Sequence, residues 1–109
     1  MEKLNLQIQI GEGKDIESSL LFDSARRKIM QITLRQNTVL KAHKAAEPIT
    51  IQCVAGTGEL IDIIKNETYE LSPGALITVE PEVVHEVRAL PEVSILLTKF
   101  KNDNDLRVT

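Results

Sequence analysis

The sequence predicts an all-β fold, an antiparallel sandwich or barrel. Short runs that alternate apolar with polar residues, or that are rich in Ile, Val and Leu, recur along the chain with turn-forming residues between them. No segment shows the amphipathic period of a helix of about ten residues or more. The 109 residues include 42% hydrophobic but only 3% aromatic side chains, so one aliphatic core is expected. We therefore expect a single domain, residues 1–109, of about eight short strands.

The first third of the chain contains two segments with the two-residue period of a half-buried strand. Residues 4–10 alternate Leu and Ile with Asn and Gln, and residues 27–35 show a similar alternation. Residues 16–23 fit either a short strand or a turn of helix. Gln36 and Asn37 are expected to form a turn, because Asn tolerates a left-handed backbone conformation.

The rest of the chain is expected to form further short strands at residues 48–54, 59–65, 75–79, 83–90 and 93–100. The glycine-rich segment at 55–58 should turn the chain, Asn66 should form a hairpin turn with positive φ, and Pro91 should separate the last two strands. The polar tail after Phe100 is expected to fray.

Composition and charge exclude several classes of function. A net charge of −3 and a pI near 5.4 do not suit a phosphate-binding surface, and the few aromatic residues do not suit stacking on bases. No apolar run is long enough for a membrane span or a Sec-type signal, so a cytoplasmic protein is expected, with no nucleic-acid or membrane partner. Cys53 is the one cysteine and lies in an apolar run, which predicts a buried, inert thiol.

The two histidines of the chain, His43 and His85, are the main candidates for a functional site. If residues 43–53 were continuously extended, His43 would face the same way as Ile51, towards the core. By the same rule His85 shares its side with Val87. The two imidazoles are therefore expected to converge inside one cup, although they are far apart in the sequence.

The order of strands and the spacing around these histidines resemble a small single-domain cupin, an RmlC-like jelly-roll barrel or double-stranded β-helix. The first cupin motif, G-x5-H-x-H-x3,4-E-x6-G, falls on Asn37, His43, Ala45, Ile49 and Gly56. The second, G-x5-P-x4-H-x3-N, falls on Gly74, Glu80, His85 and Ala89, with its proline displaced to Pro81. The resemblance spans about residues 27–100, so the N-terminal strand and the C-terminal tail are expected to be peripheral.

In that family three histidines and a glutamate commonly hold a divalent metal, and this chain keeps two of the four. His43 and His85 are the candidate metal ligands that the resemblance implies, for Zn, Fe, Mn or Ni. A subgroup of small cupins keeps a lone His and a Gln where His43 and Gln52 stand. The residues expected to line the ligand pocket are His43, His85, Gln52, Glu47, Ile49 and Ala45. No residue is assigned a catalytic role.

Three functions remain open from the sequence. The first is a cupin that binds a small polar metabolite in the barrel mouth without a complete metal site. The second is a metal-dependent enzyme, dioxygenase- or isomerase-like, in which Glu47 or Gln52 serves as a weaker third ligand. The third is a structural or interaction barrel with no functional pocket. A homodimer is expected, because small cupins commonly dimerise and the N-terminal strand offers a sheet edge.

Three polar residues of the strands are assigned to the solvent side. Asp62 lies on an alternating strand, where a solvent-facing carboxylate is the ordinary arrangement. Gln31 and Arg35 are expected on the outer face of their strand rather than in contact with a ligand. None of the three is therefore included in the candidate pocket.

Overall fold

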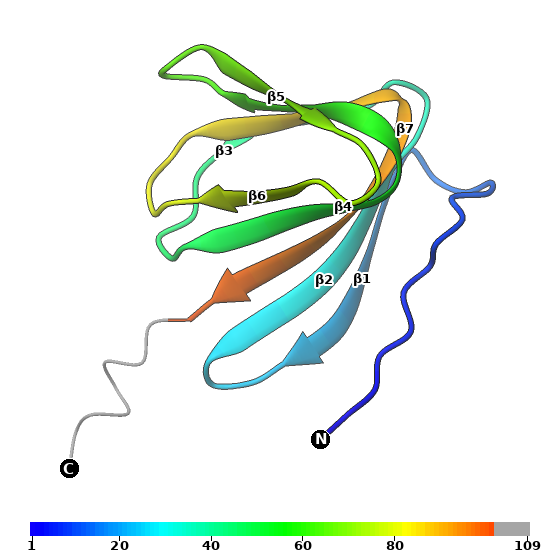
Figure 1. Ribbon diagram of the computed structural model, residues 1–109, viewed down its shortest axis with the longest axis vertical. Helices are drawn as coiled ribbons and strands as arrows, with labels where there is room; N and C mark the ends of the chain where they lie inside the picture. Colours follow the sequence, from blue (N-terminus) through cyan, green and yellow to red (C-terminus); the bar gives the residue numbers. More distant parts are fainter. Residues whose placement is uncertain (102–109) are drawn as a thin grey trace.

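The computed structural model describes residues 1–101, and these form an antiparallel all-β fold (Figure 1). The strands are β1 (Ile16–Asp23), β2 (Arg27–Leu34), β3 (Val39–His43), β4 (Ile49–Asp62), β5 (Glu67–Leu71), β6 (Leu76–Val79) and β7 (His85–Phe100). The predicted fold class is confirmed. Within residues 1–101 no helix has the length and apolar character needed to cross a membrane.

The architecture is organised by β4 and β7, which pair with each other from Ile49–Lys99 to Asp62–His85. At one end of this long pair, β2 joins β7, β1 joins β2, and β6 joins β4. At the other end, β3 joins β7 and β5 joins β4. Because β4 and β7 bend midway, the two ends face each other across a shared interior (Figure 1).

The bend in β4 occurs at glycines, where the prediction of a turn at residues 55–58 is wrong. The register with β7 shifts between Cys53 and Ala55 and again between Gly56 and Gly58, as in β-bulges, and the strand continues. Gly56 has a φ of +75°, and a Cβ built on it would lie 2.2 Å from the backbone oxygen of Glu92. The glycines therefore bend the sheet without reversing the chain, because only a residue without Cβ fits there.

The prediction that Pro91 separates two strands is also wrong. β7 runs through the cis Leu90–Pro91 peptide, and the residues on both sides pair with β4. Gly58 lies opposite Ala89, and Gly56 lies opposite Val93. Residues 48–54 and 59–65 are thus parts of one long strand, as are residues 83–90 and 93–100. In all, the described residues contain seven strands.

The core fills the space between the two ends of the bent sheet. Its fully buried aliphatic side chains include Leu34, Ile51, Leu71, Val93 and Ile95, each 0% exposed. They come from β2, β4, β5 and β7, so burial of aliphatic surface holds the two ends together. Cys53 lies among them, and burial raises the pKa of its thiol. The reactive thiolate is therefore disfavoured, in agreement with the predicted buried, inert cysteine.

The N-terminal segment, residues 1–15, is not part of any strand, so the strand predicted at residues 4–10 is wrong. The segment lies along the outer face of β1 and β2. The side-chain amide of Gln31 accepts a hydrogen bond from the Gln7 N–H (3.0 Å) and donates one to the Gln7 carbonyl (2.7 Å). A side chain of β2 thus takes the place of a neighbouring strand. Among the apolar positions of the segment Leu4 and Leu6 are half-buried, whereas Ile8 is 72% exposed.

The predicted turns at Gln36–Asn37 and Asn66 are confirmed by their positive φ values of 57°, 55° and 56°. Residues 16–23, for which strand and helix were both open, form a strand. His43 ends β3, a strand that the sequence did not predict. The C-terminal tail from residue 102 lies outside the described residues.

Candidate functional site

His85 opens β7 and is 2% exposed. Its Nδ1 lies 2.9 Å from the backbone carbonyl oxygen of Val83. Because a carbonyl oxygen only accepts hydrogen bonds, Nδ1 carries the hydrogen, and Nε2 of the neutral ring presents a lone pair. Nε2 is the one buried side-chain polar atom of residues 1–101 that has no hydrogen-bond partner.

The pKa of His85 lies below its ordinary value of 6.5. Burial is the main cause, since the charged imidazolium loses its hydration, and the neighbouring His43 lowers it further. The hydrogen bond to Val83 and the carboxylate of Asp62 act in the opposite direction but do not reverse the shift. His85 is therefore neutral near pH 7.

His43 ends β3 and lies directly opposite His85 in the strand pair. The ring centroids are 4.4 Å apart and the ring planes are inclined by 57°. His43 is exposed, and its Nδ1 lies 2.9 Å from the carbonyl oxygen of Lys41, two residues earlier in the chain. Each histidine is thus oriented by a carbonyl at the same offset, and the expected convergence of the two rings is found.

A cavity of about 400 Å³ borders His85. It is lined by Leu60, Asp62, Lys65, Tyr69, Leu76, Ile77, Thr78, Val79, Glu80, Val83 and His85. It therefore lies between the edge of β6 that pairs with no described strand and the facing parts of β4, β5 and β7. Five of the eleven lining residues are aliphatic and six carry polar groups, so the cavity offers both kinds of surface to a small molecule.

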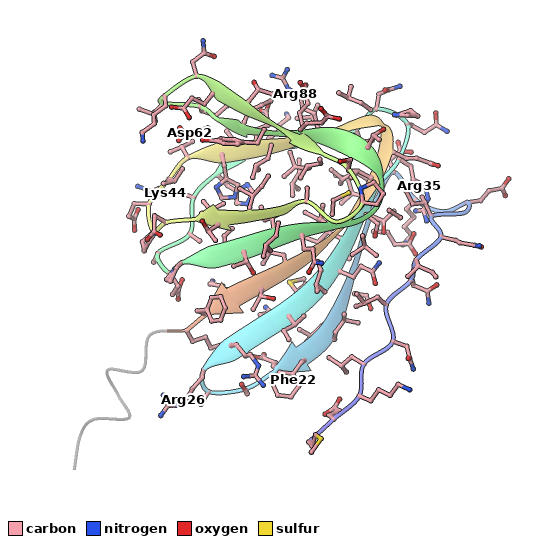
Figure 2. All side chains as sticks on the ribbon, in the orientation of Figure 1. Phe22, Arg26, Arg35, Lys44, Asp62 and Arg88 are labelled. Atoms are coloured by element: carbon pink, nitrogen blue, oxygen red, sulfur yellow. The ribbon has the colours of Figure 1, made fainter. Side chains whose placement is uncertain are left out.

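Asp62 and Tyr69 supply polar groups to this cavity. Asp62 is the register partner of His85 in the β4–β7 pair, and its Oδ1 accepts a hydrogen bond from the Lys65 N–H at 3.0 Å. The Tyr69 hydroxyl donates to Glu67 at 2.7 Å, a bond that raises the pKa of the phenol. Figure 2 places Asp62 and Lys44 on the open side of the bent sheet and Arg35 beside the bend.

The structure brings only some of the sequence-predicted pocket residues together. His43 and His85 are in contact, but among the predicted residues only His85 lines the cavity. Ile49 is a core residue, 3% exposed, and Ala45 packs against the core. The other two predicted residues, Glu47 and Gln52, lie elsewhere: Glu47 pairs with Lys99 at 3.5 Å and Gln52 is exposed.

Sequence reasoning missed Asp62 because it relied on the ordinary preference of a carboxylate for solvent. Alternation along residues 59–65 places Asp62 on the same side of the strand as Leu60, which is 2% exposed. Asp62 is half-buried and lines the cavity together with Leu60. This shared side with an apolar neighbour was the available signal.

Gln31 and Arg35 do lie on the outer face of β2, as expected, but they are buried at 4% and 8% exposure beneath the N-terminal segment. A second cavity, of about 500 Å³, borders them. The Arg35 guanidinium donates to the carbonyls of Ile10, Gly11 and Lys14 and pairs with Glu17 at 2.5 Å. These buried polar groups are satisfied within the chain. They therefore hold the N-terminal segment in place, and among the described residues around this cavity no buried side-chain group is left unpaired for a ligand.

The donor set was also tested against the metal that the resemblance implies. A transition-metal site in an enzyme usually has at least three protein ligands. Within residues 1–101 no three His, Cys, Asp or Glu side chains are grouped closely enough to hold an ion. The two imidazoles alone therefore do not make a site with three protein ligands.

No protein-family model matches the sequence, and no curated protein is significantly similar to it. Solved structures do share the fold. An RmlC-like cupin protein from Desulfovibrio desulfuricans is 21% identical, with a TM-score of 0.78, covering 92% of this chain and 96% of that one. A cupin superfamily protein from Desulfitobacterium hafniense is 13% identical, with a TM-score of 0.76 and 84% coverage of both chains.

The polyketide cyclase RemF from Streptomyces resistomycificus is 18% identical, with a TM-score of 0.74, covering 92% of this chain and 79% of that one. At these identities the likeness establishes a shared fold and nothing more. One fold can carry unrelated chemistry, so the function has to be argued from the cavity and its residues.

Proposed function

We propose that this chain, which has the fold of the cupins, binds a small polar molecule in the cavity beside His85, without a metal held by three protein ligands. The observation that carries the proposal is that His85 lines the cavity and that its buried Nε2 has no hydrogen-bond partner within residues 1–101. Leaving a buried acceptor unsatisfied costs about 1–3 kcal/mol. A ligand that donates a hydrogen bond to Nε2 recovers that free energy.

The size of the cavity supports the same proposal. Sites for small molecules commonly measure about 300–1,000 Å³, and the cavity of about 400 Å³ falls within this range. Its polar groups, Asp62, Lys65 and Tyr69, offer further hydrogen bonds near the opening. A barrel without a functional pocket would have packed side chains beside His85, so the cavity does not support that third hypothesis.

The test is a screen of small hydroxylated, amino and carboxylated metabolites against the full chain by two-dimensional NMR. We expect hits to shift the amide signals of Leu60, Asp62 and Tyr69. Binding should weaken at least about tenfold in His85→Phe, which keeps a flat ring but removes the acceptor. Gln52→Ala is the matched control, because Gln52 is exposed and does not line the cavity.

Two outcomes would contradict the proposal. One is a screen in which no compound shifts the cavity residues. The other is a set of hits whose affinity is the same in His85→Phe as in the wild type. If Gln52→Ala weakened binding as much as His85→Phe does, the ligand would bind at the exposed Gln52 and not in the cavity.

A metal-dependent enzyme remains a second candidate because the two imidazoles are in contact and both are oriented by carbonyls at Nδ1. Second-shell bonds of this kind commonly orient metal-binding histidines. His43 and His85 would then be the ligands, and a bound ion would supply Lewis-acid or redox chemistry. Calorimetric titration with Zn, Fe, Mn and Ni tests this candidate. It is ruled out if the wild type binds each metal no more tightly than a His43→Ala, His85→Ala double variant does.

A further inference from the structure

We infer that the small polar molecule bound beside His85 is an uncharged hydroxyl compound, a phenol or alcohol whose O–H donates to Nε2, and that carboxylates and phosphates are rejected. This rests on the proposed function, since it names the class of ligand for the same cavity. Three features of the cavity carry the inference: the hydrogen-bonding character of Nε2, the charges nearby, and the aliphatic wall.

The first feature is that Nε2 of the neutral His85 accepts a hydrogen bond and has no hydrogen to donate. The Val83 carbonyl fixes the hydrogen on Nδ1 through the 2.9 Å contact. A carboxylate or phosphate oxygen also accepts and would meet the lone pair of Nε2 directly. Such an anion would find no hydrogen-bond donor at Nε2.

The second feature is that the charges lining the cavity oppose an anion. Two carboxylates, Asp62 and Glu80, line the cavity with a single ammonium, Lys65. An anionic ligand would therefore face more negative than positive charge.

The third feature is the apolar wall next to the histidine. Leu60, Ile77, Val79 and Val83 line the cavity, and Leu60 and Val79 are 2% and 7% exposed. An ordered water needs two to four polar partners to be stable in a buried place. The apolar part of such a ligand packs against these aliphatic side chains, which water does not do favourably. Its hydroxyl group donates a hydrogen bond to Nε2.

The contrast with the second cavity supports the assignment to this one. There, the buried polar side chains Gln31 and Arg35 are hydrogen-bonded to the N-terminal segment. Within residues 1–101 the one buried side-chain polar atom without a hydrogen-bond partner is Nε2 of His85, a residue that lines the first cavity. The geometry therefore points to a ligand at His85 and to an intact structural contact at Arg35.

The experiment compares three probes of similar size on the full chain: phenol, anisole and benzoate. Phenol carries the O–H, anisole lacks the hydrogen, and benzoate replaces it with an anion. Amide shifts of the cavity residues give the affinities, and the nitrogen shift of His85 Nε2 reports the hydrogen bond directly. A site built to pair with a hydroxyl discriminates strongly against an analogue that lacks it, so we expect phenol to bind at least about tenfold more tightly than either.

The Nε2 shift should move with phenol and stay unchanged with anisole, a readout in the wild type that requires no variant. In His85→Phe the preference for phenol over anisole should disappear, whereas Gln52→Ala should keep it. Equal or tighter binding of anisole or benzoate overturns the inference but leaves cavity binding intact. Failure of all three probes to shift the cavity residues also overturns the inference, whereas the proposed function is overturned only if every compound of the metabolite screen fails as well.

Discussion

At the scale of single residues, His43 and His85 share one arrangement. Each ring donates from Nδ1 to the carbonyl of the residue two positions earlier, Lys41 for one and Val83 for the other. In the neutral state both Nε2 atoms are therefore acceptors and cannot hydrogen-bond to each other. The pair is held by strand register and ring contact, which leaves its hydrogen-bonding capacity for a donor from outside.

Burial of His85 predicts a dependence of stability on pH. The pKa of His85 in the folded chain is below its unfolded value, near 6.5. Below about pH 6.5 the unfolded chain therefore binds a proton that the folded chain binds less well. The free energy of unfolding should fall as the pH decreases from about 6.5 through the lower folded pKa, and this contribution should be fully present at higher pH.

Urea unfolding at about pH 7.5 and about pH 5.5 measures this effect. His85→Phe should lose much less stability between the two pH values than the wild type does. His43→Phe is the matched variant, and it should retain most of the dependence because His43 is exposed. A wild-type pH dependence that survives unchanged in His85→Phe would contradict the assignment.

At the scale of elements, the bend in β4 and β7 brings the histidines and the cavity walls together. Asp62 and His85 meet at one end of the long pair only because β4 continues past Gly56 and Gly58 instead of turning. The crowding at these glycines is with the backbone of β7, at Glu92 and Arg88. The bend is therefore specified by close approach of two strands.

We expect Gly56→Ala to destabilise the fold more than Gly74→Ala does. Both glycines have positive φ, +75° and +98°, so both substitutions carry the cost of about 1–2 kcal/mol for a left-handed residue. Only at Gly56 would the new Cβ also collide with a backbone oxygen, whereas nothing lies within 4 Å at Gly74. Thermal or urea unfolding compares the two variants, and equal losses would mean that crowding does not set the bend.

The N-terminal segment depends on the side chain of Gln31. Gln31→Met keeps the length of the side chain but removes both hydrogen bonds to Gln7 and the one to Ser94. We expect a loss of about 1–3 kcal/mol and faster hydrogen exchange at the Gln7 amide. Gln9→Met, at an exposed position of the same segment, is the control. Unchanged exchange at Gln7 in Gln31→Met would show that other contacts hold the segment.

At the scale of the whole molecule, alternation and turn chemistry were enough to predict the fold class. Positive φ at Asn37 and Asn66 reflects a local preference of Asn, so these turns were predictable. The continuation of β4 through its glycines was not predictable, because a glycine between two strand-like runs is compatible with either a turn or a β-bulge. The strand predicted at residues 4–10 failed for a related reason: alternation fixes which side faces the sheet but not whether a backbone or a side chain pairs with it.

The site was predictable only where the motif spacing applied. His43 and His85 were placed together from strand parity and the cupin resemblance, and the structure brings them into contact. The cavity beside them is formed by β5 and the edge of β6, whose positions depend on the bend. No local pattern identifies Asp62 or Tyr69 as neighbours of His85, since both are brought there by long-range pairing.

The exposed edge of β1 bears on the expected homodimer. Within residues 1–101 β1 pairs only with β2, and Leu20 on it is 56% exposed. An unpaired strand edge of this kind tends to be protected by another chain. We expect light scattering to give twice the 12.2 kDa chain mass, and Leu20→Lys to shift the protein to monomer. Leu90→Lys, at a site that is 46% exposed, should leave the dimer intact, and a wild-type monomer at all concentrations would contradict the expectation.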